Sequence, residues 1–130
     1  MSDQHSAATA ASSAFAQLSL HPALLENLQS LEYHAMTPIQ AQSLPAILEG
    51  KDVLAQAKTG SGKTAAFALG LLQRLDVRSL AVQGLVLCPT RELADQVAGE
   101  IRRLARLIPN VKVLTLCGGM PINPQFSSLE

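Results

Sequence analysis

Leucine recurs at helical intervals in the first third of the chain, and this spacing predicts a helix over residues 22–31 with Pro22 in its first turn. A second helix is expected to follow, because Thr37 and Gln40 form a capping-box pattern and Gly50 supplies a stop. A proline inside this second segment is expected to kink or loosen the helix. The hydrophobic pattern therefore begins with two consecutive helices.

Short apolar runs typical of buried strands then alternate with helical segments. Strands are predicted at 53–56, 84–88 and 111–116. A helix over 62–75 follows the first strand, and a helix capped by Thr90 follows the second. This alternation is typical of a parallel sheet covered by helices, so the sequence predicts an α/β fold with right-handed crossovers. The apolar face of the helix after Thr90 is expected to consist of Leu93, Val97, Ile101, Leu104 and Ile108.

The two ends of the chain lack this rhythm. Residues 1–13 are small and polar, so we expect a flexible leader, with ordered structure starting near Phe15. After Gly119, scattered prolines and polar residues predict no final helix or strand, although an α/β domain should continue there. We therefore interpret residues 14–130 as the N-terminal part of a truncated domain.

Composition narrows the class of protein without identifying a partner. Hydrophobic residues make up 48% of the chain and aromatic residues 3%, which indicates a globular core of aliphatic side chains. Ten basic residues balance ten acidic ones, so a nucleic-acid or membrane partner must be argued from local sites. The uncharged stretch 4–25 is too polar for a membrane span and lacks the basic start of a signal peptide.

The cysteines and histidines indicate neither disulfide nor metal chemistry. Cys88 and Cys117 each end an apolar run and lack a CxxC spacing, so we expect buried reduced thiols and a cytoplasmic protein. No metal-ligand spacing joins His5, His21 and His34.

A glycine-rich turn between the first predicted strand and its helix matches the phosphate-binding loop, with alanine in place of the first glycine. Its backbone N–H groups and the start of the helix suit a polyphosphate. Lys63 can reach the β- and γ-phosphates, and the Thr64 hydroxyl can bind Mg²⁺. The plainer alternative is a glycine-rich helix start with a solvated lysine. The loop consists of Ala57, Lys58, Thr59, Gly60, Ser61, Gly62, Lys63 and Thr64.

Two polar residues allow both a chemical and a structural interpretation. Gln40 can form the paired hydrogen bonds that recognise adenine, or it can simply cap its own helix. Arg91 can bind a phosphate, or it can form an ion pair with Asp95 at the start of its helix. The residues alone leave both alternatives open. A basic cluster at Arg102, Arg103 and Arg106 is interpreted as a solvated helix face rather than an RNA-binding stripe.

Taken in order, these motifs resemble the first RecA-like domain of the DEAD-box ATP-dependent RNA helicases, which are P-loop NTPases. The likeness runs from Phe15 to about Gly119, with departures at Glu32 and Met36, where the family usually has glycine and proline. The motifs that carry it are a glutamine motif at 32–40, the phosphate loop at 57–64, Pro-Thr-Arg-Glu-Leu at 89–93 and Gly-Gly at 118–119.

The resemblance implies ATP and Mg²⁺ as cofactors, with Lys63 and Thr64 as catalytic residues and Thr64 as a metal ligand. It implies that Phe15 stacks on adenine and that Gln40 reads the edge of the base. It also implies RNA as the partner, with large-subunit ribosomal RNA as the suggested substrate, and no membrane or obligate protein partner. The residues implied to contact the RNA backbone are Pro89, Thr90, Arg91 and Gly119.

The Asp-Glu-Ala-Asp motif that names this family is absent from the chain, and no acidic residue ends a predicted strand as hydrolysis would require. We therefore expect an ATP-binding part of a helicase, with enzyme activity of the 130 residues alone uncertain. The alternative is a fragment that binds adenine nucleotide without catalysis. A DNA helicase or transport ATPase with the same loop is disfavoured by the glutamine motif.

Strand 53–56 is also expected to lack a neighbour encoded in this sequence. An unpaired strand leaves donors and acceptors unsatisfied, so we expect poor stability of the chain on its own.

Overall fold

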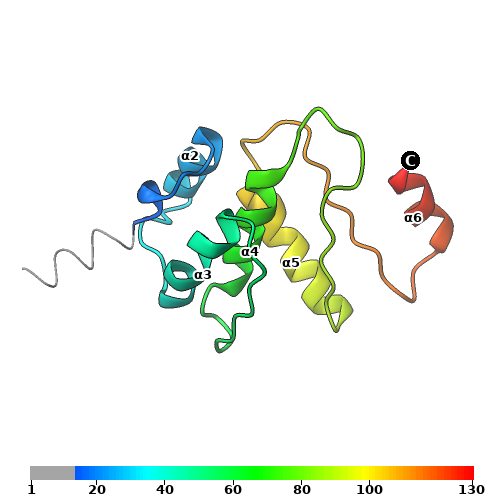
Figure 1. Ribbon diagram of the computed structural model, residues 1–130. Coiled ribbons are helices and arrows are strands. Elements are labelled where there is room, and N and C mark those ends of the chain that lie inside the picture. Colours follow the sequence, from blue (N-terminus) through cyan, green and yellow to red (C-terminus); the bar gives the residue numbers. More distant parts are fainter. Residues whose placement is uncertain (1–13) are drawn as a thin grey trace, which may run out of the picture.

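The computed structural model describes residues 14–130, and the predicted leader at 1–13 lies outside them. Ordered structure begins near Phe15, as the sequence predicts. Helices dominate the described residues (Figure 1). In chain order they are the 3-10 turn η1 (Phe15–Gln17) and the helices α2 (Pro22–Ser30), α3 (Pro38–Leu48), α4 (Lys63–Arg74), α5 (Arg91–Leu104) and α6 (Ile122–Leu129).

Helix α4 is the centre of the packed part of the molecule, because it contacts both α3 and α5 (Figure 1). Helix α2 packs against α5 and η1. The side chains between these helices are aliphatic, as the composition predicts, and close packing of such side chains supplies most of the stability of a small domain. The largest fully buried ones are Leu24, Leu28, Leu44, Leu69 and Leu104.

A glycine allows α3 and α4 to approach closely. A Cβ atom added at Gly70 would lie 2.2 Å from Cγ2 of Ile47, so a larger residue would push the two helices apart. Helix α3 continues through Pro45 to Leu48, within the range that its capping pattern predicts. The packing of α3 on α4 places the glutamine motif beside the phosphate loop, since the loop leads directly into α4.

A buried amide joins α2 to the end of α5. Asn27 is 1% exposed, and its Nδ2 donates to the carbonyl oxygens of Arg103 at 2.8 Å and Leu104 at 2.9 Å. The last carbonyls of a helix have no partner within the helix, so the side chain satisfies groups that would otherwise be buried unpaired. This contact fixes the C-terminal end of α5.

The three predicted strands do not form a sheet in this structure. Within residues 14–130, no strand ladder is present, and no backbone hydrogen bond joins 53–56, 84–88 and 111–116. A strand is stabilised by a neighbour that pairs with its N–H and C=O groups, and none of these segments has one. The strand prediction for these ranges is therefore corrected to unpaired segments. Their apolar side chains stay open to solvent, as at Leu54, Leu85, Leu87 and Leu116.

The C-terminal prediction is also wrong, because residues Ile122–Leu129 form helix α6. The prolines that argued against a helix stand at its start: Pro121 is the N-cap and Pro124 lies in the first turn. N–H groups in the first turn have no partner within a helix, so proline is tolerated there. No residue of α6 is buried. In Figure 1 this helix stands apart from the packed helices.

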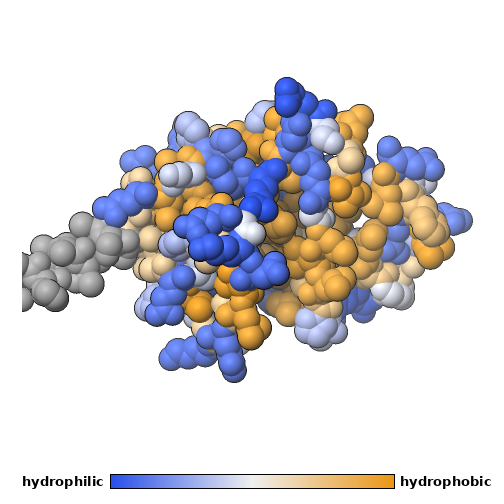
Figure 2. Space-filling view, viewed as in Figure 1, coloured by the Kyte–Doolittle hydropathy of each residue, from blue (hydrophilic) through white to orange (hydrophobic). Residues whose placement is uncertain are grey.

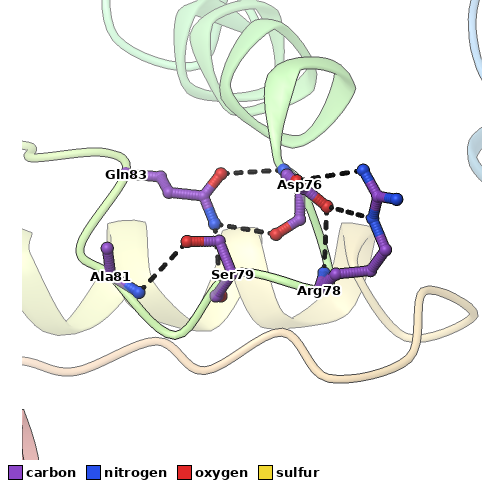
Figure 3. Close-up of polar contacts among 5 residues, drawn as sticks. All are labelled: Asp76, Arg78, Ser79, Ala81 and Gln83. Atoms are coloured by element: carbon purple, nitrogen blue, oxygen red, sulfur yellow. Dashed lines mark hydrogen bonds and ion pairs between the residues drawn. The ribbon is translucent and has the colours of Figure 1, made fainter.

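Polar contacts order the loop between α4 and the segment 84–88 (Figure 3). The Asp76 N–H donates to the Gln83 side chain at 2.7 Å, and Gln83 donates back to the Asp76 carbonyl at 2.9 Å. Arg78 donates to the Asp76 carboxylate from both its side chain and its backbone. These hydrogen bonds, the side-chain one above all, hold the pKa of Asp76 below its ordinary value.

Hydrophobic surface gathers on the side of the molecule where the unpaired segments run (Figure 2). Leu80 and Leu87 are 102% and 85% exposed, whereas the leucines between the helices are almost completely buried. Apolar surface of this extent is unusual for a monomer and indicates a face that another part of a protein covers. No helix within residues 14–130 is long and apolar enough to cross a membrane.

Candidate functional site

The phosphate loop begins where helix α4 begins. Gly60 and Gly62 have φ angles of 82° and 92°, in the left-handed region that glycine adopts without strain. Gly62 is the N-cap of α4, and Lys63 is the first helical residue. The Lys63 ammonium folds back onto the loop, donating to the carbonyl oxygens of Ala57 and, at 3.2 Å, Lys58. The loop is thus closed around its own lysine.

The loop also retains unused polar capacity. The Ser61 hydroxyl is buried and has no hydrogen-bond partner among the described residues. A Cβ added at Gly60 would meet nothing within 4 Å, so open space lies next to the backbone there. An orphaned hydroxyl, open space and a helix start are features that suit a phosphate group. Within residues 14–130, no cluster of His, Cys, Asp or Glu could hold a metal ion on its own.

Side chains of the glutamine motif contact the phosphate loop directly. The Thr37 hydroxyl donates to the Ser61 carbonyl at 2.7 Å, and Gln40 Nε2 donates to the Gly62 carbonyl at 3.1 Å. The Gln40 Oε1 atom accepts from the Thr37 N–H at 2.9 Å, so the expected helix cap is present as well. Gln40 is 5% exposed. The structural and the functional interpretations of this residue are therefore not exclusive, because one side chain caps α3 and touches the loop.

This contact restricts what can occupy position 62. A Cβ added at Gly62 would lie 2.4 Å from Gln40 Nε2 and 3.1 Å from the Thr37 hydroxyl. The positive φ angle disfavours other residues independently. Gly62 is therefore needed for the turn and for the close approach of the glutamine motif.

The aromatic residue upstream lies deeper than its expected role requires. Phe15 is 3% exposed, its N–H donates to the His34 carbonyl, and its ring stacks on Tyr33 with centroids 6.5 Å apart. Stacking on a base would require this ring to open toward solvent. Glu32, where the family has glycine, has a φ angle of 62°, so the left-handed backbone of that position is kept at some strain.

Tyr33 links this N-terminal segment to α5. Its hydroxyl donates to Glu100 Oε1 at 3.3 Å and accepts from Arg103, whose guanidinium lies 5.5 Å from the ring centroid. Burial, with the Glu100 carboxylate next in importance, raises the pKa of Tyr33. The tyrosine is thus held as a neutral hydrogen-bond donor.

The second group of candidate residues lies at the start of α5. Thr90 caps the helix as predicted, its hydroxyl accepting from the Leu93 N–H at 3.1 Å, and Pro89 precedes it. Arg91 Nη1 donates to the Gly118 carbonyl at 3.4 Å. A Cβ added at Gly119, whose φ is 76°, would lie 3.2 Å from the same nitrogen. The structure therefore brings the 89–93 and 118–119 motifs together.

The ion pair of Arg91 with Asp95 is not among those formed within residues 14–130. The other basic residues of α5 have protein partners. Arg102 donates to the Val113 carbonyl, and Arg106 donates to the Ser30 hydroxyl. Arg103 pairs with Glu100 at 2.6 Å. These exposed arginines serve as tethers between segments, which agrees with a solvated helix face better than with a binding stripe.

Sequence reasoning missed Gln125 on α6. Its amide accepts from the Cys117 N–H at 3.0 Å and donates to the Cys117 and Pro121 carbonyls at 3.3 and 3.0 Å. The signal available in the sequence was a glutamine one turn after a possible proline N-cap, but it depended on recognising α6 first.

Comparison with known proteins identifies the group to which these features belong. The family model described as "DEAD/DEAH box helicase" matches residues 37–130. The chain is 68% identical over 111 residues to the ATP-dependent RNA helicase DbpA of Escherichia coli, covering 85% of this chain and 24% of that protein. It is 44% identical over 116 residues to the helicase CshA of Bacillus cereus, covering 89% and 22%. The chain thus spans about a quarter of the length of these relatives.

Solved structures agree with this match. A DEAD box protein from Methanococcus jannaschii superposes with a TM-score of 0.85 at 36% identity, covering 91% of this chain and 32% of that one. Saccharomyces cerevisiae Dbp5 bound to RNA and ADP BeF3 gives a TM-score of 0.70 at 32% identity, covering 73% and 25%. These neighbours are RecA-like domains, so the predicted fold class is confirmed even though the strands of this chain are unpaired.

Proposed function

Because this chain belongs to the DEAD/DEAH box helicase family, we propose that it forms the ATP-binding part of an ATP-dependent RNA helicase similar to DbpA. In this proposal, residues 14–130 are the N-terminal part of the first RecA-like domain, and residues 57–64 grip the phosphates. The observation that carries it is the pair of hydrogen bonds from Thr37 and Gln40 to the loop carbonyls.

ATP fits the loop as the structure presents it. The backbone N–H groups around Gly60 and Gly62 and the start of α4 provide the positive end of a helix for the phosphates. The unpaired Ser61 hydroxyl provides a further donor. Lys63 would exchange its contacts with the Ala57 and Lys58 carbonyls for phosphate oxygens. We assign Lys63 and Thr64 as the catalytic residues.

Mg²⁺ would be held by the Thr64 hydroxyl together with the phosphates, where the ion supplies charge neutralisation for phosphoryl transfer. The protein's own contribution is to orient the triphosphate through the main chain and one ammonium. Within residues 14–130, no Asp or Glu forms a hydrogen bond or ion pair with the loop.

Base recognition involves the same side chain that caps α3. Gln40 would turn its amide from Gly62 and the Thr37 N–H to the edge of adenine, which offers a matching donor and acceptor. We propose that Phe15 covers the base when its segment opens. A free site and an occupied site would then differ in how the glutamine motif holds the loop.

RNA contacts are proposed for the second group of residues. The N-terminal end of α5 suits a phosphate of the RNA backbone, and Thr90 and Arg91 stand there with Pro89 beside them. Gly119 places its backbone next to Arg91. By similarity to DbpA we further propose large-subunit ribosomal RNA as substrate, a role in ribosome assembly and a cytoplasmic location.

Calorimetry with ATP and GTP tests the nucleotide site. Lys63→Ala should weaken ATP binding at least tenfold, since it removes the charge that reaches the phosphates. Gln40→Ala should cost about 1–3 kcal/mol of discrimination between adenine and guanine nucleotides. Gln42→Ala is the matched control, because this exposed glutamine lies on the same helix. Equal affinity of the unmodified chain for ATP and GTP would refute adenine recognition.

A second candidate function is binding of adenine nucleotide without turnover. The absence of any acidic partner of the loop among the described residues favours it for the 130 residues alone. It predicts background ATPase activity with and without RNA, unchanged by Lys63→Ala. Turnover that Lys63→Ala abolishes would exclude it.

A further inference from the structure

We propose that Gln125 is a positioning residue that fixes the Gly118–Gly119 turn against Arg91, and thereby sets the affinity of this face for RNA. The inference rests on the proposed RNA contact of Arg91 and Gly119. It assigns a role to α6, a helix whose side chains are otherwise exposed or half-buried.

The amide of Gln125 takes the place of a neighbouring strand. It accepts from the Cys117 N–H at 3.0 Å and donates to the Cys117 carbonyl at 3.3 Å, so both polar groups of one backbone residue are paired with one side chain. The same Nε2 also faces the Met120 and Pro121 carbonyls, at 3.5 and 3.0 Å. The side chain therefore spans both ends of the glycine turn.

This bracket bears directly on the arginine. The next residue after Cys117 is Gly118, whose carbonyl accepts from Arg91 Nη1 at 3.4 Å. Gly119 then turns with a φ of 76° and passes close to the same guanidinium. With residues 117, 120 and 121 held by Gln125, the intervening turn has little freedom, and Arg91 has a fixed carbonyl to lean on. A pre-ordered cation loses less entropy when it binds a phosphate.

Other contacts explain why α6 stays near the segment but not how the turn is set. Lys112 donates to the Ser128 carbonyl at 2.5 Å at the far end of the helix. The apolar residues Ile122 and Phe126 are 61% and 58% exposed, so burial does not anchor the helix. Gln125 is thus the contact that joins α6 to the glycine turn.

The test compares Gln125→Leu, which keeps the approximate size but removes the hydrogen bonds, with Gln125→Glu, which keeps the acceptor alone. Asn123→Ala is the matched control, since Asn123 is an exposed amide on the same helix. The chain at its natural full length is titrated with a single-stranded oligoribonucleotide and, separately, with ATP. Amide hydrogen exchange at residues 117–119 is measured in parallel.

For Gln125→Leu we expect RNA affinity to fall about three- to tenfold, ATP affinity to stay within about twofold, and amide exchange at Cys117 to rise at least tenfold. Gln125→Glu should fall between Gln125→Leu and the unmodified chain. In an Arg91→Ala background, Gln125→Leu should weaken RNA binding no further, because the glutamine acts through the arginine.

Unchanged exchange at Cys117 would overturn the positioning role. So would equal losses of ATP and RNA affinity, since those would indicate a general loss of folding. If Arg91→Ala leaves RNA affinity unchanged, the proposed RNA contact fails, and with it the claim that Gln125 sets RNA affinity. Faster exchange in Gln125→Leu would in that case still support the bracket itself.

Discussion

The two sides of this molecule are built by different means. On one side, helices α2 to α5 enclose aliphatic side chains such as Leu69, which is completely buried. On the other, the segments 80–88 and 111–120 expose theirs, and α6 is attached mainly through polar contacts. The phosphate loop belongs to the packed side, whereas the Gly118–Gly119 turn belongs to the open one. The difference indicates that a nucleotide site can be rigid here while the facing RNA site depends on a few hydrogen bonds.

A matched pair of leucine truncations should show the largest contrast between the two sides. Leu69→Ala should lower the free energy of unfolding by about 2–5 kcal/mol, because it leaves a cavity in the packed core. Leu85→Ala, at a position 78% exposed, should change it by less than about 0.5 kcal/mol. Urea denaturation followed by helical circular dichroism measures both. Equal losses would mean that the open side is covered in solution.

The polar anchor of α5 should come next in size. Asn27→Leu should cost about 1–3 kcal/mol of unfolding free energy, because it strands the Arg103 and Leu104 carbonyls without a donor. Gln29→Ala on the same helix is exposed and serves as the control. The same denaturation experiment decides the matter, and a neutral Asn27→Leu would show that water replaces the amide.

A stabilising change is expected where the packed side holds a strained residue. Glu32→Gly should raise the free energy of unfolding by about 0.5–1 kcal/mol, since glycine relieves the left-handed backbone but costs some entropy in the unfolded chain. Asn110→Gly is a useful comparison, because asparagine tolerates the same φ of 62° better and should gain less. Thermal melting of both variants measures the difference. A drop in melting temperature for Glu32→Gly would contradict the strain.

The smallest effect is expected in the exposed loop of Figure 3. Arg78→Ala should raise the pKa of Asp76 toward its ordinary value, because the hydrogen bonds that favour the carboxylate are lost. Since the folded pKa is lowered, the contribution of this contact is present above the unfolded pKa and disappears as pH falls through the folded one. NMR titration of the Asp76 carboxyl measures it, with Arg106→Ala as control. An unaltered pKa would show that the contact does not persist in solution.

The helices could be predicted from the sequence because their signals are local. Pro22, the Thr37–Gln40 capping pattern and the Thr90 cap each lie within one turn of the helix they start, and α2, α3 and α5 begin at those points. The left-handed turn at Gly62 was equally readable, since the residue type itself indicates the backbone.

Features that depend on distant partners could not be predicted in this way. A strand forms only where a neighbour completes it, so 84–88 looked like a strand in composition but has no partner here. The contacts of Gln40 with Gly62 and of Arg91 with Gly118 join residues far apart in the chain, and they became visible only in the fold. The roles implied for Phe15, Pro89 and Thr64 remain predictions.

Lys63 illustrates how an empty site can store its own substitute ligand. Its ammonium is already solvated by two peptide oxygens, so arrival of a triphosphate swaps one set of oxygen neighbours for another. The heat released at this residue should then be only the residue left by two nearly cancelling terms. Such a balance would let the nucleotide leave as readily as it arrives, which suits a machine that must reset after every cycle.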